Sequence, residues 1–129
     1  MMQLLARDKS SPICLRTDFP FPVRGQRLSY FEITVLDPEG TNRTKMDSSH
    51  LPLTVGFCGE FCDQTLANMG WNVWSVGYHG NDGSIFEEAS RGKHKSERKF
   101  GIGFTVGCGI NFYREEYYFT LNGNVVGTS

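Results

Sequence analysis

One stretch of the chain decides its fold: Gly70-Trp71-Asn72-Val73-Trp74-Ser75-Val76-Gly77-Tyr78-His79-Gly80-Asn81-Asp82-Gly83. Aromatic residues and glycines follow each other closely here, a pattern that predicts a strand leading into a tight turn. The turn is 80–83, because Gly, Asn and Asp tolerate the positive φ angles that turns require. We expect Trp71 and Tyr78 to be buried, since the rings of a glycine-flanked strand pack inward against a facing sheet.

Two segments before this stretch also predict strands. Residues 30–36 place Phe31, Ile33 and Val35 on one face, which is the alternation of a strand with one buried side. A turn and a polar loop follow, and residues 53–58 then form a second strand with the same alternation. We expect these two strands to be antiparallel neighbours.

The last third of the chain predicts a further strand pair. The charged segment 87–99 is typical of a solvated loop. Residues 105–112 then alternate as a strand with Cys108 on its apolar face, and 117–121 returns in the opposite direction. Asn122-Gly123 predicts a type I′ hairpin turn, because both of its positions need positive φ. No segment predicts a helix of useful length, so we expect an all-β fold.

Length and composition suit one small domain with many turns. The chain has 129 residues, of which 39% are apolar and 15 are glycine. Its formal net charge of −1 gives no field that would attract nucleic acid or an anionic membrane. The first residues contain no apolar core long enough for a signal peptide, and no run could span a bilayer. We therefore expect a cytoplasmic protein without nucleic-acid binding or membrane insertion.

The four cysteines are expected to be reduced thiols without a metal. A zinc site built from Cys58, Cys62 and His79 lacks a fourth ligand and the spacing of a zinc knuckle. A nucleophilic triad of Cys62 or Cys108 with His79 and Asp82 is also disfavoured, because a thiol in mid-strand on an apolar face behaves as a small hydrophobe. The sequence thus predicts no catalytic residues, no metal and no cofactor.

Aromatic side chains near the predicted turns favour recognition over catalysis, since loops held by a rigid scaffold commonly carry binding surfaces. We expect the partner-binding residues to lie on adjoining loops: Arg16, Asp18, Phe19, Glu60, Phe61, Gln64, Trp74 and Asp82. The aromatic members would anchor a ligand, whereas Arg16 and the carboxylates would orient its backbone.

Three motifs identify a family. They are Leu15-Arg16-Thr17-Asp18-Phe19-Pro20-Phe21-Pro22, Tyr30-Phe31-Glu32-Ile33 and Val76-Gly77-Tyr78-His79-Gly80-Asn81-Asp82-Gly83. They resemble the V-R-(T/S)-x-x-P-I-P, Y-Y-F-E-V and Y-G-Y-H-G-D-D-G motifs of SPRY domains of the Ran-binding-protein-M type and of fungal ubiquitin-ligase adaptors. The resemblance implies that residues 15–129 form a bent antiparallel β-sandwich, of the SPRY or concanavalin-like jelly-roll type, behind an N-terminal lead-in of residues 1–14.

The same resemblance implies that the chain is either a truncated domain or a shortened variant that covers its exposed edges differently. Relatives continue for several tens of residues, so this chain would lack their C-terminal strands. Val106, Ile110 and Phe119 would then face water, and exposed sheet edges would recruit partners, including a second copy of the chain. Residues 1–12 are the segment expected to fold over the gap if it is covered.

The function that the resemblance implies is binding. It implies a non-enzymatic module that binds a peptide or protein through its loops, as the substrate-recognition part of a ubiquitin-ligase or scaffold assembly. A lectin-like sandwich that binds carbohydrate stays open, because a fold does not determine a function. A host-directed effector of a symbiont or pathogen and a thiol hydrolase are the remaining alternatives.

Overall fold

Short alternating segments form strands throughout the part of the chain that the structure describes. The computed structural model describes residues 16–17, 20, 25, 27–36, 53–59, 75–87 and 92–128, and the side chains of all of these except 92–95. In these residues lie β1 (Leu28–Thr34), β2 (Thr54–Cys58), β3 (Ser75–His79), β4 (Ser84–Glu87), β5 (Gly92–Lys95), β6 (Thr105–Asn111), β7 (Glu116–Leu121) and β8 (Asn124–Thr128).

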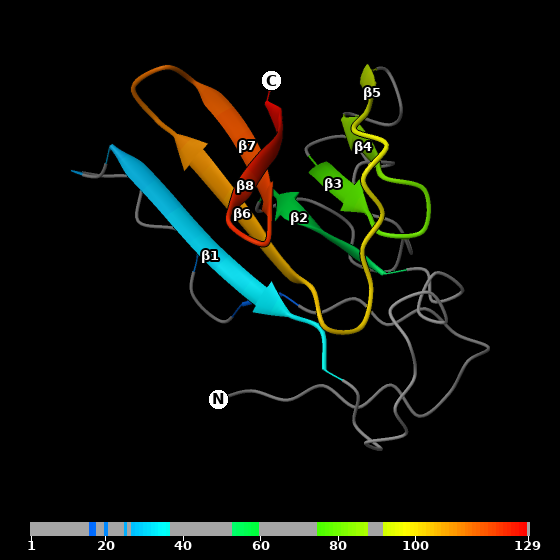
Figure 1. Ribbon diagram of the computed structural model, residues 1–129. Coiled ribbons are helices and arrows are strands. Elements are labelled where there is room, and N and C mark those ends of the chain that lie inside the picture. Colours follow the sequence, from blue (N-terminus) through cyan, green and yellow to red (C-terminus); the bar gives the residue numbers. More distant parts are fainter. Residues whose placement is uncertain are drawn as a thin grey trace.

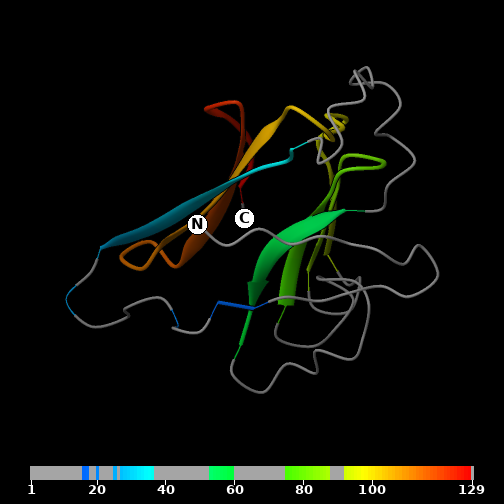
Figure 2. The same cartoon turned by 90° about the horizontal axis from the view of Figure 1, so that it is seen from below.

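These strands form two four-stranded antiparallel sheets. Sheet A has the order β1-β6-β7-β8, and sheet B has the order β2-β3-β4-β5. Figure 1 shows sheet A in cyan, orange and red beside the largely green sheet B. Seen from below in Figure 2, the two sheets form separate layers. The expected all-β sandwich is confirmed. Over the described ranges the structure has no helix long and apolar enough to cross a membrane.

The partners of the first two strands differ from the prediction. β1 pairs with β6, with Phe31 opposite Cys108, whereas β2 pairs with β3, with Gly56 opposite Gly77. Residues 30–36 and 53–58 therefore belong to different sheets and are not neighbours. The prediction rested on closeness in sequence, which favours a hairpin. The long connection between these two strands allows the chain to cross to the other sheet instead.

The position of β1 at a sheet edge also explains why its predicted inner face is only partly covered. Phe31 and Val35 are half-buried, and Ile33 is 43% exposed. An edge strand has a neighbouring strand on one side only, so its side chains receive less cover than those of a central strand.

A further difference concerns the charged segment 87–99, which was expected to be a solvated loop. It contains β5, which pairs with β4 and places His94 opposite Ile85. Without β5, β4 would present a row of unpaired backbone groups. Backbone pairing does not depend on apolar side chains, so the composition of the segment did not indicate this strand.

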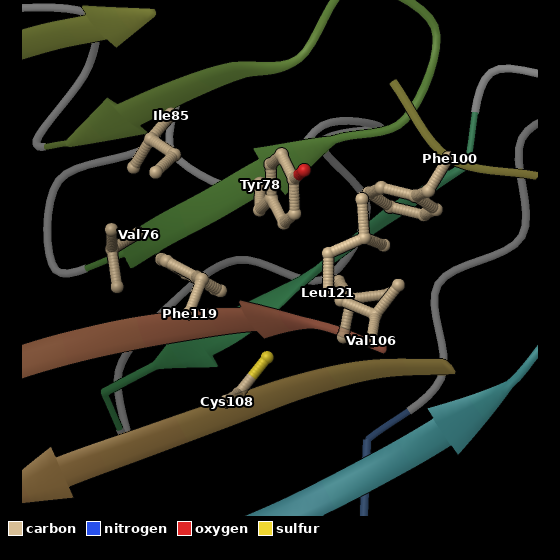
Figure 3. Packing of buried hydrophobic residues seen from close by; sticks show 9 residues of the cluster. Val76, Tyr78, Ile85, Phe100, Val106, Cys108, Phe119 and Leu121 are labelled. Carbon is tan, nitrogen blue, oxygen red and sulfur yellow. The ribbon is translucent and has the colours of Figure 1, made fainter. Parts of the chain in front are cut away.

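The core lies between the sheets (Figure 3). Its largest fully buried side chains come from both layers: Tyr78 and Ile85 from sheet B, and Val106, Cys108 and Phe119 from sheet A. The rings of Tyr78 and Phe119 meet with centroids 5.6 Å apart. The predicted burial of Tyr78 is confirmed, while Trp71 lies outside the described residues.

The prediction that core residues of sheet A would face water is wrong for two of its three examples. Val106 and Phe119 are both 0% exposed. Sheet B covers them, so their burial does not require additional strands. Ile110 is half-buried at one end of the sandwich.

Both predicted turns are confirmed by their backbone angles. Asn122 and Gly123 have φ of 49° and 83°, as the type I′ turn between β7 and β8 requires. The Asn122 Oδ1 also accepts the N–H of Thr105 at 2.9 Å. In the turn between β3 and β4, Gly83 has a φ of 73°.

We predict that Tyr78 is one of the largest single contributors to stability. Replacement by Ala removes a fully buried ring and should lower the free energy of unfolding by about 3–5 kcal/mol. Replacement by Phe removes only the hydroxyl that donates to the Arg98 carbonyl, which should cost about 0.5–1.5 kcal/mol. Denaturant unfolding measures both changes. An Ala variant as stable as the Phe variant would contradict the packing argument.

A second prediction concerns Gly56, where the backbones of β2 and β3 approach closely. A Cβ at this position would lie 2.0 Å from the carbonyl oxygen of Val76 and 2.8 Å from the Cα of Gly77. Gly56→Ala should therefore lower the free energy of unfolding by about 1–3 kcal/mol, the usual cost of overpacking. Val125→Ala, at a side chain that is 62% exposed, is the control. Equal thermal midpoints for the two variants would show that β2 and β3 can separate.

Candidate partner-binding site

The two ends of the sandwich are built differently. The turn end carries the β3–β4 turn (80–83), the β7–β8 turn (122–123) and the segment 96–104 that leads into β6. The opposite end, which we name the groove end, carries the β6–β7 hairpin at 112–115. The end of β2 and the start of β3, which pair with each other, also lie there.

Of the predicted site residues, the structure describes Arg16 and Asp82. Asp82 lies at the turn end, whereas the connection from β2 to β3 leaves and re-enters the sandwich at the groove end. Strand β3 separates the two, and its five residues span about 16 Å. Successive connections of an antiparallel meander alternate between its ends, so the end of β2 and the start of β3 lie at the opposite end of the sandwich from Asp82.

Asp82 has a structural task in its turn. Its Oδ1 accepts the N–H of Ser84 at 2.8 Å, and its side chain is half-buried. An Asp that binds the backbone two residues ahead stabilises the turn itself. Arg16 is exposed. The other predicted site residues lie outside the described residues: Asp18, Phe19, Glu60, Phe61, Gln64 and Trp74.

An open cavity of about 560 Å³ lies at the groove end. The described residues that line it are Phe57 and Val76 from sheet B, and Ile110, Phe112, Glu115, Glu116 and Tyr117 from sheet A and its hairpin. Both sheets contribute walls, so the cavity is a property of their packing. Its volume lies in the range of ordinary ligand sites.

Hydrogen bonds hold the hairpin that forms the rim of this cavity. The Oδ1 of Asn111 accepts the N–H groups of Tyr113 and Arg114, both at 3.1 Å. The N–H of Phe112 donates to the carbonyl of Arg27, before β1, at 2.9 Å. The rim is therefore tied to its own hairpin and to the strand beside it.

A side-chain hydrogen bond connects the sheets at the same end. The hydroxyl of Tyr117 on β7 donates to the Oε2 of Glu87 on β4 at 2.9 Å. Burial, and then the hydrogen bond and negative charge of Glu87, raise the pKa of Tyr117 well above its ordinary value. The protonated hydroxyl is the donor of this hydrogen bond, which holds the Glu87 carboxylate next to Tyr117.

Sequence analysis missed these lining residues. Phe57, Val76 and Ile110 follow the alternation of strands, which does not distinguish the wall of a cavity from the core. The signal that could have found the cavity is the placement of Glu115-Glu116 at a hairpin between aromatic residues. Charged residues at the end of a sandwich are otherwise typical of a solvated turn.

The predicted chemistry of the cysteines can be examined at Cys108. Its side chain is fully buried in β6, and burial raises the pKa of its thiol far above the ordinary value. A neutral, inaccessible thiol is not a nucleophile. His79 lies in the other sheet, where its ring packs against that of Phe86 with the ring centroids 4.6 Å apart. Where the structure describes the chain, no three His, Cys, Asp or Glu side chains converge as metal ligands would.

Comparison with known proteins agrees with this architecture. A model of the SPRY domain family matches residues 28–129. The chain belongs to the SPRY domain family. A crystal structure of a human SPRY domain superimposes with a TM-score of 0.61 over 78% of this chain and 59% of that one, at 24% sequence identity. This similarity supports the fold.

Relatives with longer chains contain similar segments. The SPRY domain is 48% identical over 62 residues to a Ran-binding protein M homolog of Arabidopsis thaliana, covering 45% of this chain and 12% of that protein. It is 28% identical over 127 residues to a Ran-binding proteins 9/10 homolog of Drosophila melanogaster, covering 95% of this chain and 12% of that one. A dual specificity protein kinase, splA of Dictyostelium discoideum, is 28% identical over 89% of this chain and 4% of its own.

The chain thus spans about an eighth, or less, of the length of these relatives. What it shares with them is the SPRY domain. Membership of this family indicates a protein-interaction module.

We predict that the burial of Cys108 makes stability depend on pH. The folded protein keeps the thiol proton to a higher pH than the unfolded chain does. The neutral, buried thiol therefore makes its full contribution to the free energy of unfolding below the ordinary thiol pKa of 9.0, and this contribution is lost as the pH rises above that value. The loss should be about 1.4 kcal/mol per pH unit. Denaturant unfolding between pH 8 and about 10.5 should show that the free energy of unfolding declines less in Cys108→Ala than in the parent protein. Equal slopes in the two proteins would mean that this thiol ionises in the folded state.

Proposed function

We propose that this SPRY domain is a non-enzymatic module that holds a segment of a partner protein at its groove end. The observation that carries the proposal is the open cavity between the two sheets, whose rim is held by hydrogen bonds. A preformed cavity saves the ordering cost that a flexible site would require on binding.

The walls of the cavity support a peptide or protein ligand. Three aromatic side chains, Phe57, Phe112 and Tyr117, line it beside Val76 and Ile110. Aromatic residues in partly covered pockets are frequent anchors of protein interfaces.

The predicted binding loop is connected to the same place. The β2–β3 connection starts after Cys58 and ends before Ser75. Cys58 directly follows Phe57 and Ser75 directly precedes Val76, and both of these neighbours line the cavity. We therefore keep Glu60, Phe61, Gln64 and Trp74 in the proposed surface, together with Arg16, Asp18 and Phe19 from the first predicted motif. Asp82 is left out, because its place at the turn end supports a role in the turn.

We also propose that the domain acts in the cytoplasm as the substrate-recognition part of a ubiquitin-ligase or scaffold assembly. The support is the resemblance of its motifs to ubiquitin-ligase adaptors, together with its similarity to a Ran-binding protein M homolog and a Ran-binding proteins 9/10 homolog. Proximity labelling by the chain in cells should enrich ubiquitin-ligase subunits. Labelling no greater than that of a sandwich protein from another family would contradict this assignment.

We predict that the chain selects peptides from a random display library and binds them with one-to-one stoichiometry. Phe112→Ala removes an aromatic wall of the cavity and should weaken the selected peptides by about tenfold or more. Val125→Ala, on the exposed side of β8, should leave their affinity unchanged. Calorimetric titration measures these affinities. A selection that returns no peptide with saturable binding would contradict a peptide-binding module.

A further inference from the structure

The cavity carries information about the chemistry of its ligand. We infer that the groove end binds a segment in which an aliphatic or aromatic side chain is flanked by Lys or Arg. This inference rests on the proposed function and deepens it by stating what kind of partner segment is selected.

The apolar half of the inference comes from the walls. Phe57, Ile110, Phe112 and Tyr117 are each half-buried, and together they leave apolar surface open to solvent inside a concave site. Covering such surface is favourable in proportion to its area. An apolar side chain of the ligand therefore supplies the anchor.

The charged half comes from the rim. Among the described residues that line the cavity, the ionisable side chains apart from the Tyr117 hydroxyl are the carboxylates of Glu115 and Glu116. A third carboxylate, that of Glu87, is bound to the Tyr117 hydroxyl next to them. Arg114 belongs to the same hairpin but is not among the lining residues. Within the described lining the charge is thus of one sign.

The placement of these carboxylates favours selectivity over raw affinity. Glu115 is exposed and Glu116 half-buried, so a cation beside them is not fully removed from water. Pairs in such positions add modest affinity but discriminate against ligands of like charge. An acidic segment with the same apolar anchor would bring carboxylates against carboxylates.

The geometry of the rim determines on which side of the apolar anchor the ligand must carry its positive charges. Glu115 has a φ of 56°, and the turn that holds it is fixed by the Asn111 side chain. A ligand must therefore present its cations on the hairpin side of its anchor. Basic residues alone, without an anchor, would leave the apolar walls exposed.

The test uses the 129-residue chain and four synthetic pentapeptides. Three of the peptides have a central leucine, which is flanked by two lysines, by two glutamines or by two glutamates. The fourth has a central serine flanked by two lysines. Binding is followed through the methyl NMR signals of Val76 and Ile110 at low and at physiological salt. We expect the leucine–lysine peptide to bind about tenfold more tightly than the leucine–glutamate peptide at low salt, with the difference shrinking as salt rises.

Charge-neutral variants assign the selectivity to the rim. Glu115→Gln together with Glu116→Gln should weaken the leucine–lysine peptide by about threefold to tenfold and leave the leucine–glutamine peptide unchanged. Glu97→Gln with Glu32→Gln is the matched control, since it removes the same charge from exposed positions that do not line the cavity. It should leave every affinity as in the parent.

Three results would overturn the inference. Equal affinities for the lysine- and glutamate-flanked leucine peptides would show that the site does not select for positive charge. Equal affinities for the leucine–lysine and serine–lysine peptides would show that the site does not need an apolar anchor. Shifts of the Val76 and Ile110 signals with protein concentration alone would show that a second copy of the chain occupies the cavity.

The failure of the proposed function would look different. If peptides selected from the random library bind but shift signals away from Val76 and Ile110, the domain is a binding module and only the groove-end site is wrong. If no library peptide binds anywhere, the module itself is wrong.

Discussion

The relative position of the two sheets depends on how one crossing segment is fixed. Residues 96–104 lead from β5 in sheet B to β6 in sheet A. The N–H of Ser96 donates to the Gly83 carbonyl at 2.9 Å, and the N–H of Phe100 donates to the Gly80 carbonyl at 3.0 Å. The buried Tyr78 binds the Arg98 carbonyl between these two bonds. A segment held at three points cannot slide along the β3–β4 turn, and β6 therefore starts from a fixed place.

The same arrangement explains why the groove end is the open one. At the turn end, Phe100 fills the space between the layers and is 3% exposed, with its ring 4.8 Å from that of Tyr78. At the other end the sheets are joined by the Tyr117–Glu87 hydrogen bond. A hydrogen bond between long side chains connects two layers without filling the volume between them. Apolar side chains of both sheets consequently remain accessible around it.

Local patterns could be predicted from the sequence, but long-range ones could not. The Asn122-Gly123 turn and the buried Tyr78 follow from backbone preferences and from alternation, which neighbouring residues determine. The pairing of β1 with β6 depends on segments far apart in the sequence. The walls of the cavity also come from segments far apart in the sequence, and the alternation of Phe57, Val76 and Ile110 does not by itself distinguish a cavity wall from the core. Which of them stay half-exposed is decided by how the two layers end.

The acidic rim also has a consequence for the free protein. An open apolar cavity favours non-specific contacts, because any apolar surface that covers it is removed from water. Two copies meeting groove to groove would bring Glu115 and Glu116 of each into one place, and this repulsion opposes such a pair. The carboxylates therefore affect every candidate occupant. They repel an identical copy of the chain and attract a basic segment. A site with apolar walls alone would lack that distinction, so the rim supplies the specificity that the walls cannot.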